Sequence, residues 1–193
     1  MFPVIVMCFG QDAGVGLELR LLTRREADRV IARRRDPAAD PPWAGGYPLE
    51  GDIRAAAAYA THLPASGGGD AVDVFGYYQV LEDGVVVGGI GFHGPPSGHV
   101  VEVGYGVVPS VRGRGVATQA LRILLKVAAG LEGVRRVVGR TEETNLASQG
   151  VMRAAGMHLV GRDPDFLHFE IDLQSGAAAS GRQTGAEPGD QRR

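Results

Sequence analysis

The residues best suited to chemistry are arginines and glycines in a short stretch of the chain, Val111–Thr118, with the sequence V-R-G-R-G-V-A-T. Glycine has no Cβ and readily adopts positive φ, so Gly113 and Gly115 allow successive backbone N–H groups to converge on one point. Arg112 and Arg114 add positive charge beside them. An apolar run precedes the stretch and a helical pattern follows it, so the positive end of a helix dipole also points there. This arrangement is typical of a pyrophosphate-binding turn.

The stretch differs from two common phosphate-binding motifs. It lacks the Gly-Lys-Ser/Thr ending of a P-loop and the G-x-G-x-x-G spacing of a dinucleotide-binding fold, which argues against both kinds of nucleotide. It resembles the acyl-CoA-binding motif of the GNAT superfamily of N-acyltransferases, Arg/Gln-x-x-Gly-x-Gly/Ala after a strand. A second segment, Asn145–Met157, is similar to that family's Asn-containing element on the helix beside the coenzyme. With both motifs in family order, the chain is identified as a member, resembling the branch of ribosomal-protein N-terminal acetyltransferases.

The resemblance implies acetyl-CoA as co-substrate and the residues that hold it. They are the turn and the helix start after it, Arg112, Gly113, Arg114, Gly115, Val116, Ala117 and Thr118, together with Asn145 of the second motif. Two small residues in the strand before the turn, Gly104 and Gly106, suit a bulge or a close backbone approach. In the family such a bulge frees backbone groups for the pantetheine arm, and by position Val107 and Val108 carry them.

Acyl transfer from a thioester to an amine requires that the amine be neutral. A lysine-type amine with a pKa of ~10.4 is neutral less than about one time in a thousand at pH 7, so such an acceptor needs a base or a desolvating pocket. Glu102 is the candidate base, because it lies within an otherwise apolar strand a few residues before the turn. The alternative is a solvated surface residue, since Glu102 alternates with Val101 and Val103.

The departing thiolate requires a proton or a hydrogen-bond donor. Many family members use a Tyr seven residues after the Asn of the second motif, but this chain has Met152 there, which cannot donate a proton. Ser148, three residues after Asn145 and on the same helix face, is the candidate in its place. The resemblance to the ribosomal-protein branch assigns a Ser this role toward the coenzyme sulfur. The alternatives are that Ser148 caps or packs and that Asn145 caps its own helix.

The acceptor site is less well marked. Trp43, Tyr47 and Glu50 lie in a Pro/Gly-rich loop that forms the substrate wall in the family, so they are candidates to close over an acceptor; equally, they anchor the loop to the core. Tyr105 is a candidate hydrogen-bond partner for the acceptor or a core residue. His93, at a strand end, is interpreted as a surface residue, and the histidines show no metal-ligand spacing, so no metal is expected.

Composition indicates one soluble domain. The chain has 193 residues, 44% of them hydrophobic, a net charge of -2 and a single cysteine, Cys8. One cysteine excludes an internal disulfide and suits a reducing, cytoplasmic location. The balanced charge argues against nucleic acid, and the apolar N-terminal run fits neither a signal peptide nor a membrane span. We therefore expect a cytoplasmic monomer or homodimer with no membrane or nucleic-acid partner.

The elements that position these residues follow an α+β pattern. We predict a strand at residues 17–21, a helix capped by Thr23, a helix at 52–61, three antiparallel strands before the turn, a helix to about residue 129, a strand at 137–141, the Asn145 helix and two closing strands. The resemblance covers residues 17–173 and implies a mixed, mostly antiparallel sheet, splayed at its centre, with helices on both faces. Residues 1–16 are predicted to be an extra segment or a strand, and residues 174–193 a disordered tail.

Three functions remain open at this point. The first is an acetyl-CoA-dependent N-acetyltransferase acting on a small-molecule amine or a protein N-terminus. The second is a non-catalytic acyl-CoA sensor, which the missing Tyr favours, and the third is an enzyme using a longer acyl group or a hydroxyl acceptor. The acids Glu50, Asp52 and Glu102 indicate a cationic acceptor without identifying it.

Overall fold

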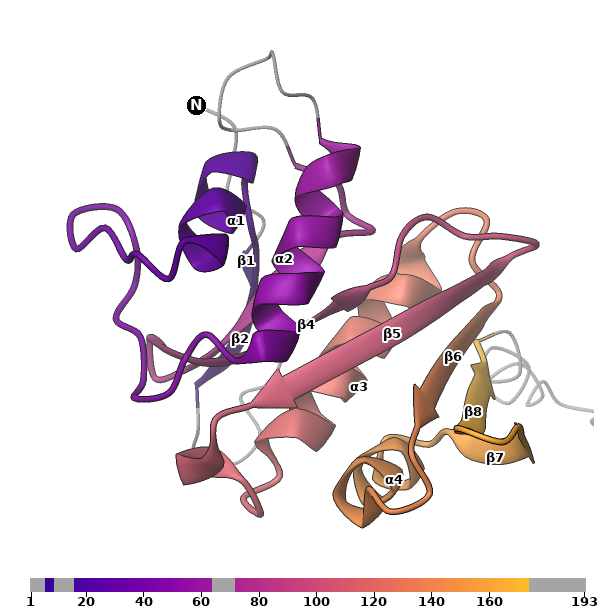
Figure 1. Cartoon of the computed structure of the whole chain (residues 1–193). Helices are drawn as coiled ribbons and strands as arrows, with labels where there is room; N and C mark the ends of the chain where they lie inside the picture. The colour runs from indigo at the N-terminus through magenta and orange to yellow at the C-terminus, as the bar shows by residue number, and fades with distance from the viewer. Residues whose placement is uncertain (1–5, 9–15, 64–71, 174–193) are drawn as a thin grey trace, which may run out of the picture.

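The computed structural model describes residues 6–8, 16–63 and 72–173 (Figure 1). It contains an eight-stranded mixed sheet with the strand order β1-β2-β3-β4-β5-β6-β8-β7. The strands are β1 (Val6–Cys8), β2 (Leu17–Leu21), β3 (Tyr77–Glu82), β4 (Val85–Phe92), β5 (Val100–Val107), β6 (Arg136–Thr141), β7 (His158–Arg162) and β8 (Leu167–Asp172). The helices are α1 (Arg24–Ile31), α2 (Glu50–His62), α3 (Val116–Gly130) and α4 (Leu146–Ala154), with a 3-10 turn at Pro109–Val111. The predicted α+β class is confirmed.

Local sequence signals account for several of these elements. Thr23 and Glu26 form the predicted capping box at the start of α1, with Thr23 N–H donating to a Glu26 carboxylate oxygen at 2.8 Å. Asp83 and Gly84 join β3 to β4 with φ of 49° and 79°, the pair of positive values that a two-residue type I′ hairpin requires. Within the N-terminal segment, the strand alternative holds for residues 6–8, since β1 pairs antiparallel with β2, and residues 1–5 and 9–15 lie outside the described residues. The predicted tail at residues 174–193 lies outside the described residues.

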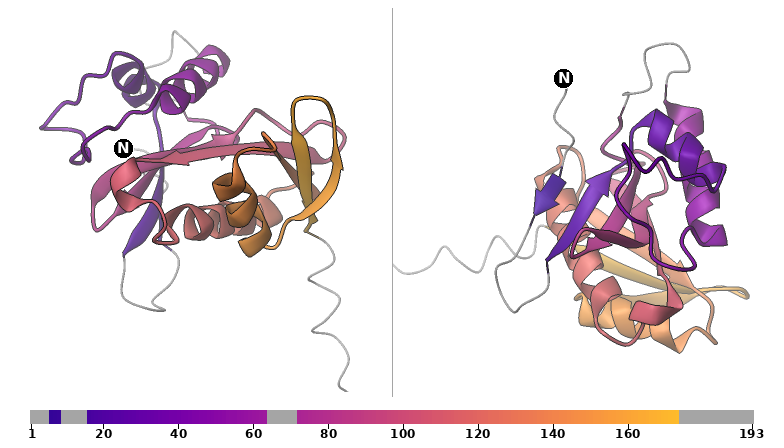
Figure 2. Two further views of the ribbon diagram at one scale, coloured as in Figure 1. Left: turned by 60° about the horizontal axis from the view of Figure 1, so that its bottom comes forward. Right: turned by 90° about the vertical axis from the view of Figure 1, so that its left-hand side faces the viewer.

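Helices cover both faces of the sheet (Figure 2). α1 and α2 lie on one face, and α3 and α4 lie on the other. The core on the second face is built from the apolar side of α3, including Leu121 and Leu124, which are fully buried. Within the described ranges, no helix is long and apolar enough to cross a membrane.

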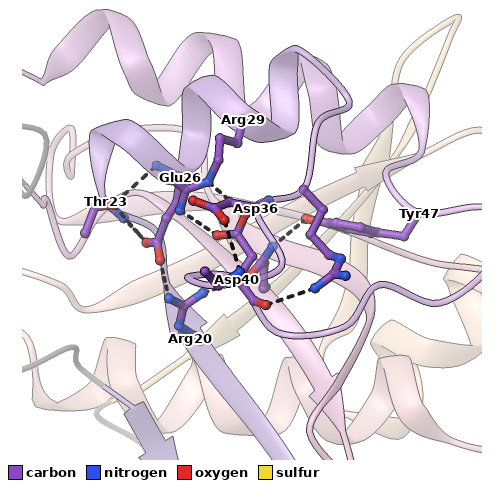
Figure 3. Close-up of polar contacts among 10 residues, drawn as sticks. Arg20, Thr23, Glu26, Arg29, Asp36, Asp40 and Tyr47 are labelled. Carbon is purple, nitrogen blue, oxygen red and sulfur yellow. Dashed lines mark hydrogen bonds and ion pairs between the residues drawn. The ribbon is translucent and has the colours of Figure 1, made fainter.

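A polar network fixes α1 and the loop after it to the sheet (Figure 3). Glu26 joins the helix cap to Arg20 of β2 through an ion pair. Arg29, one turn further along α1, contacts both carboxylate oxygens of Asp40 at 2.7 and 2.5 Å. Both acids are largely buried, so each depends on its arginine and backbone partners to offset desolvation. The network therefore holds the connection between α1 and α2 against the sheet.

The sheet opens between its two central strands. β5 and β6 run parallel but pair only from Val100 with Arg136 to Glu102 with Val138, at the beginning of β5. The remainder of β5 diverges from β6, and α4 lies on the α3 face beside this opening (Figures 1 and 2). The splay that the family resemblance implies is therefore present, and it faces the end of β5 that leads into the Arg/Gly turn.

The expected bulge in β5 is not observed. β5 pairs with β4 from Gly88 with Val107 to Phe92 with Val103 without a shift. At Gly104 and Gly106 a Cβ would meet side chains, His93 Nε2 at 2.5 Å and Leu49 Cδ1 at 3.4 Å. A close backbone approach is found at their partner strand, where a Cβ on Gly88 would lie 2.2 Å from the carbonyl oxygen of Gly106. The register shift in this region lies between β3 and β4, at Val80/Leu81. Glycine in these strands thus allows backbones to meet rather than inserting an extra residue.

Candidate active site

The Arg/Gly turn has the backbone conformation predicted for an anion-binding site. Gly113 and Gly115 have φ of 74° and 84°, and nothing lies within 4 Å of the position that a Cβ would occupy on either. Gly115 is the N-cap of α3, and no side chain of the described residues caps it. The first N–H groups of a fifteen-residue helix therefore point at open space beside the turn.

The two arginines of the turn have different partners. Arg112 Nε donates to the carbonyl oxygen of Val107 at 3.2 Å, which folds its side chain back toward the end of β5. Arg114 forms a two-pronged ion pair with Glu82 of β3, at 3.1 and 3.0 Å. Such fork-like pairing fixes both distance and angle. Arg114 therefore tethers the turn to the β3–β4 hairpin.

The open edge of β5 has backbone groups available to a ligand. Backbone groups of a strand point alternately toward its two neighbours. Val108 N–H donates to Val87 on the β4 side at 2.8 Å, so the groups of Val107 and Tyr105 point to the opposite side, toward the opening. Of the two valines expected to contact the pantetheine arm, Val107 faces the opening, where its carbonyl oxygen already accepts from Arg112 Nε, and Val108 donates to β4.

A cavity of about 630 Å³ lies between α2 and the β3–β4–β5 part of the sheet. Its floor includes two glycine pairs that face each other across β4 and β5, Gly89 with Gly106 and Gly91 with Gly104. Since opposite residues of an antiparallel pair share a face, these four positions offer no side chain to the cavity. The remaining walls come largely from α2, with residues of β3 and of the segment after β4.

Glu102 lies beside this cavity in a charged cluster. Its Oε1 accepts a hydrogen bond from Arg140 Nε of β6 at 2.8 Å and lies 3.3 Å from His93 Nδ1. The His93 side chain is 51% exposed and lines the cavity, whereas Glu102 is 26% exposed and does not line it. The predicted base is therefore next to the cavity but separated from it by an imidazole.

Ser148 lies on the other side of β5, where α4 approaches the opening. Its Oγ is 2.9 Å from the hydroxyl of Tyr105, which also donates to the carbonyl oxygen of Ser148 at 3.0 Å. Burial raises the pKa of Tyr105 above its ordinary value of 10.0, and the bond to Ser148 partly offsets this effect. Tyr105 therefore stays protonated near neutral pH, and two hydroxyl groups stand together beside the opening.

The remaining residues of the second motif have structural contacts. Asn145 is the N-cap of α4, and its side-chain oxygen accepts from Ser148 N–H at 3.0 Å, as in the capping alternative. Met152, which replaces the family Tyr, is buried, and its terminal methyl lies 3.1 Å from a Cβ built on Gly139 of β6. This position thus belongs to the core between α4 and the sheet.

The three loop residues predicted to contact the acceptor are not among the described residues that line the cavity. Tyr47 is buried, and its hydroxyl accepts from Gln79 Nε2 at 3.2 Å (Figure 3). Trp43 pairs with Val86 at the start of β4 and meets the Tyr47 ring edge-on. Glu50 begins α2, which starts two residues earlier than predicted, and forms an exposed ion pair with Arg33. Of the residues predicted to contact the acceptor, Tyr105 alone is in the cavity lining, although its hydroxyl reaches Ser148 on the opposite face of β5.

A buried carboxylate also lines the cavity. Asp52, in the first turn of α2, is only 3% exposed. Burial raises the pKa of Asp52 to about 6, although the Leu49 N–H donates to it at 2.7 Å and the nearby Tyr77 hydroxyl also favours its charged form. A carboxyl group with this pKa changes charge close to physiological pH, so the cavity wall becomes more attractive to cations as pH rises.

Two features of the site were missed in the sequence. The surface position predicted for His93 is found, since its side chain is 51% exposed. Its place opposite Glu102 was missed, and it follows from extending the β4–β5 register one step beyond Phe92 with Val103. The glycines at alternate positions of β4 and β5 were the available signal, since Gly89 and Gly91 share a face with His93. The approach of Tyr105 to Ser148 carried no comparable signal, because it depends on how α4 packs.

A mixed sheet that opens between two parallel strands, with a glycine turn and a helix start at the opening, is the architecture of GNAT-type acyltransferases. The family described as "Acetyltransferase (GNAT) domain" matches residues 16–158. The chain belongs to this family. Among the described residues, no group of three or more His, Cys, Asp or Glu side chains is placed to hold a metal ion.

Individual proteins resemble the chain over part of its length or at low sequence identity. A Bacillus subtilis (strain 168) protein named uncharacterized N-acetyltransferase YjdG is 32% identical over 85 residues, which cover 44% of this chain and 51% of that protein. The chain thus matches about half the length of this curated relative. The structure of a ribosomal-protein-S5-alanine acetyltransferase from Vibrio fischeri aligns with a TM-score of 0.58 at 14% identity, over 88% of this chain and 97% of that one. The structure of AAC(6')-Ib with paromomycin and acetyl-CoA aligns with a TM-score of 0.59 at 14% identity, over 89% and 100%.

Proposed function

We propose that the protein transfers the acetyl group of acetyl-CoA to a primary amine, carried by a small molecule or by a protein N-terminus. The observation that supports this most strongly is the position of the open edge of β5. It lies between the Arg/Gly turn at one end and the glycine-floored cavity on the α2 face. A coenzyme along this edge and an amine in the cavity would meet at the middle of β5.

The turn and the strand edge suit the parts of the coenzyme. The pyrophosphate would bind the N–H groups from Gly113 to Thr118, with Arg112 and Arg114 nearby, because this is where unpaired N–H groups and the helix dipole converge. The pantetheine arm would bond to β5 through backbone groups such as those of Val107, as an added strand does. Asn145 would hold the coenzyme from the side of α4.

The reaction needs one base and one acid on opposite sides of β5. The amine nitrogen forms a bond to the acetyl carbon while the carbon–sulfur bond breaks. In the proposal Glu102 drives removal of the amine proton, and Ser148, backed by Tyr105, donates a hydrogen bond or a proton to the departing sulfur. Starting from an ammonium ion, the products are an amide, a thiol and one proton released to water.

We further propose that the acceptor is cationic. The buried carboxyl of Asp52 lines the cavity, and Glu102 lies beside it, so an ammonium group would find negative charge in a desolvated place. The two solved structures described above are titled as a ribosomal-protein-S5-alanine acetyltransferase and as AAC(6')-Ib in complex with paromomycin and acetyl-CoA, which supports an amine acceptor of either kind. Either class is compatible with the proposal.

The first test is stabilisation by acetyl-CoA. At about a hundred times its dissociation constant, a ligand that binds only the native state adds ~2.7 kcal/mol, which corresponds to several degrees at roughly 2–4 °C per kcal/mol for a domain of this size. The shift should disappear in Gly113→Glu, which places a side chain and a negative charge in the turn. Gly133→Glu is the matched control, because Gly133 also has positive φ and open space at its Cβ position.

The second test is turnover. Wild-type protein and acetyl-CoA are incubated with a panel of polyamines, aminoglycosides and Ala- or Ser-initiated peptides, and free thiol is measured with each amine. Amine-dependent thiol release supports the proposal. Binding without release would indicate a sensor, release with longer acyl-CoA alone would indicate a different donor, and the absence of any shift would overturn the coenzyme assignment.

A further inference from the structure

The α2 face of the β4–β5 pair changes character along its length. Gly89 and Gly91 face Gly106 and Gly104, and one step further the register brings His93 opposite Glu102. The backbones of the last two residues are joined, with His93 N–H donating to the Glu102 carbonyl oxygen at 2.9 Å. Opposite residues of an antiparallel pair place their side chains on one face about 4.5–5.5 Å apart. His93 is thus the first side chain that this row offers to the cavity.

The imidazole separates Glu102 from the cavity. Its Nδ1 lies 3.3 Å from Glu102 Oε1, and that oxygen also accepts from Arg140 Nε at 2.8 Å. Its Nε2 points the other way and lies over the glycine floor, because a Cβ on Gly104 would be 2.5 Å from it. An amine in the cavity would therefore meet His93 Nε2 before it could meet the carboxylate.

We propose that His93 is the catalytic base and that Glu102 is its positioning residue; this rests on the proposed function above. Glu102 Oε1 lies 3.3 Å from Nδ1, so the carboxylate favours a proton on that nitrogen and hence the tautomer whose unprotonated Nε2 faces the cavity. Glu102 also fixes the ring plane, and Arg140 holds the carboxylate in place. The acceptor's N–H bond breaks, an N–H bond forms at Nε2, and the imidazolium returns the proton to water through its 51% exposed side chain.

The charged groups around His93 come from three elements. Glu102 of β5 and Arg140 of β6 form the cluster just described. From α2, Arg54, His62 and Asp52 line the same cavity.

The first test compares two acceptors. With the best amine from the panel, His93→Gln should lower kcat/KM by about 10²-fold or more. With methoxyamine, whose amine is neutral at pH 7, the loss should be far smaller, because no proton has to be removed before attack. A purely structural role of His93 would reduce both rates equally. Stabilisation by acetyl-CoA should be unchanged in the variant.

Two further variants address positioning. Gly104→Ala keeps His93 and Glu102 but puts a methyl group where Nε2 lies, so it should reproduce the acceptor-dependent loss of kcat/KM. Gly161→Ala is the control, because Gly161 is a strand glycine with open space at its Cβ position. Glu102→Gln should change the ring tautomer of His93, read from the 15N shifts of Nδ1 and Nε2 by NMR on 15N-histidine-labelled protein and assigned with His93→Gln. Glu132→Gln, at an exposed site, should leave it unchanged.

The outcomes separate this inference from the function on which it rests. If wild-type protein acetylates amines and His93→Gln is equally active while Glu102→Gln is not, Glu102 is the direct base and the inference is wrong. An unchanged His93 tautomer in Glu102→Gln would also overturn the positioning role. If wild-type protein neither binds acetyl-CoA nor releases thiol, the proposed function fails first, and the inference fails with it.

Discussion

The two faces of β5 are built from opposite kinds of residue. Toward α3 and α4, the strand presents Val101, Val103, Tyr105 and Val107, three valines that pack in the core and a tyrosine that reaches α4. Toward α2, it presents Glu102 and then the glycines at 104 and 106. Because side chains alternate along a strand, one eight-residue segment can fill space on one face and leave space on the other. A single strand can thus serve two substrates.

The two faces also differ in the chemistry of their polar groups. The α2 face carries ionisable side chains, with His93, Glu102 and Asp52 in or beside the cavity. The α4 face carries the hydroxyl groups of Tyr105 and Ser148. In the proposed reaction the first face takes up a proton and the second provides one. Substitutions confined to one face should therefore produce separable effects.

The largest effect is expected on the α4 face. Ser148→Ala removes the hydroxyl next to the proposed position of the thiolate, and loss of a positioned acid lowers turnover by about 10²-fold or more. Turnover is measured as thiol release at saturating amine. Stabilisation by acetyl-CoA should persist, since the turn at Gly113 and Gly115 is intact.

Ser97→Ala provides the control for that substitution, because Ser97 is exposed and pairs with the start of β5 at Val100 through its backbone, which the substitution keeps. It should retain full turnover. Equal turnover in Ser148→Ala and Ser97→Ala would show that Ser148 only packs at the start of α4. Ser148 would then not be the acid on the α4 face.

An intermediate effect is expected from Asp52, on the α2 face, in the pH dependence of the free energy of unfolding. Folding raises the pKa of Asp52 from 3.8 to about 6, mainly by burial. The folded protein therefore binds the Asp52 proton more tightly than the unfolded chain does. The contribution of this proton to the free energy of unfolding is fully present below the unfolded pKa and is lost as pH rises through about 6. Roughly two pKa units correspond to about 3 kcal/mol. Asp52→Asn, which does not titrate, should gain up to that amount relative to wild type between pH 4 and pH 7.

Urea unfolding at several pH values measures this difference. Asp28→Asn is the control, because Asp28 lies on the exposed side of α1 and its side chain is 55% exposed. Its unfolding free energy relative to wild type should change little over the same range. Parallel pH profiles for wild type and Asp52→Asn would contradict the raised pKa.

The smallest effect is expected for Tyr105→Phe. The substitution keeps the ring but removes the hydroxyl that contacts both the Ser148 carbonyl and its Oγ. A lost hydrogen bond of this kind costs about 1 kcal/mol, and Ser148 keeps its own hydroxyl, so turnover should fall only several-fold. A loss as large as in Ser148→Ala would instead make Tyr105 the principal acid.

Much of the fold follows from local signals. The capping box at Thr23 and Glu26, the Asp83–Gly84 turn and the strand alternation at residues 17–21 each involve neighbours in the sequence, so they could be predicted without knowledge of packing. The Arg/Gly turn belongs to the same class. Its conformation depends on its own glycines and on the helix that begins at Val116.

The acceptor site could not be predicted to the same degree. Its cavity depends on how α2 crosses the sheet, so the loop residues Trp43, Tyr47 and Glu50 were favoured over cavity-lining residues of α2. The partners of Glu102 lie 9 residues earlier and 38 residues later in the chain, and only strand pairing brings them together. The sequence therefore indicated that Glu102 could act as a base, but it did not indicate which side chains contact Glu102.

The opening between β5 and β6 gives the sheet a third edge. β1 and β7 form its two outer edges, and the part of β5 beyond its short pairing with β6 forms an internal one. Unpaired strand edges are templates for association with other chains. A ligand that bonds along β5 would act as a removable strand, so acetyl-CoA should protect the protein from aggregation beyond its effect on the unfolding midpoint. A bound coenzyme would thus also limit association of this edge with other chains.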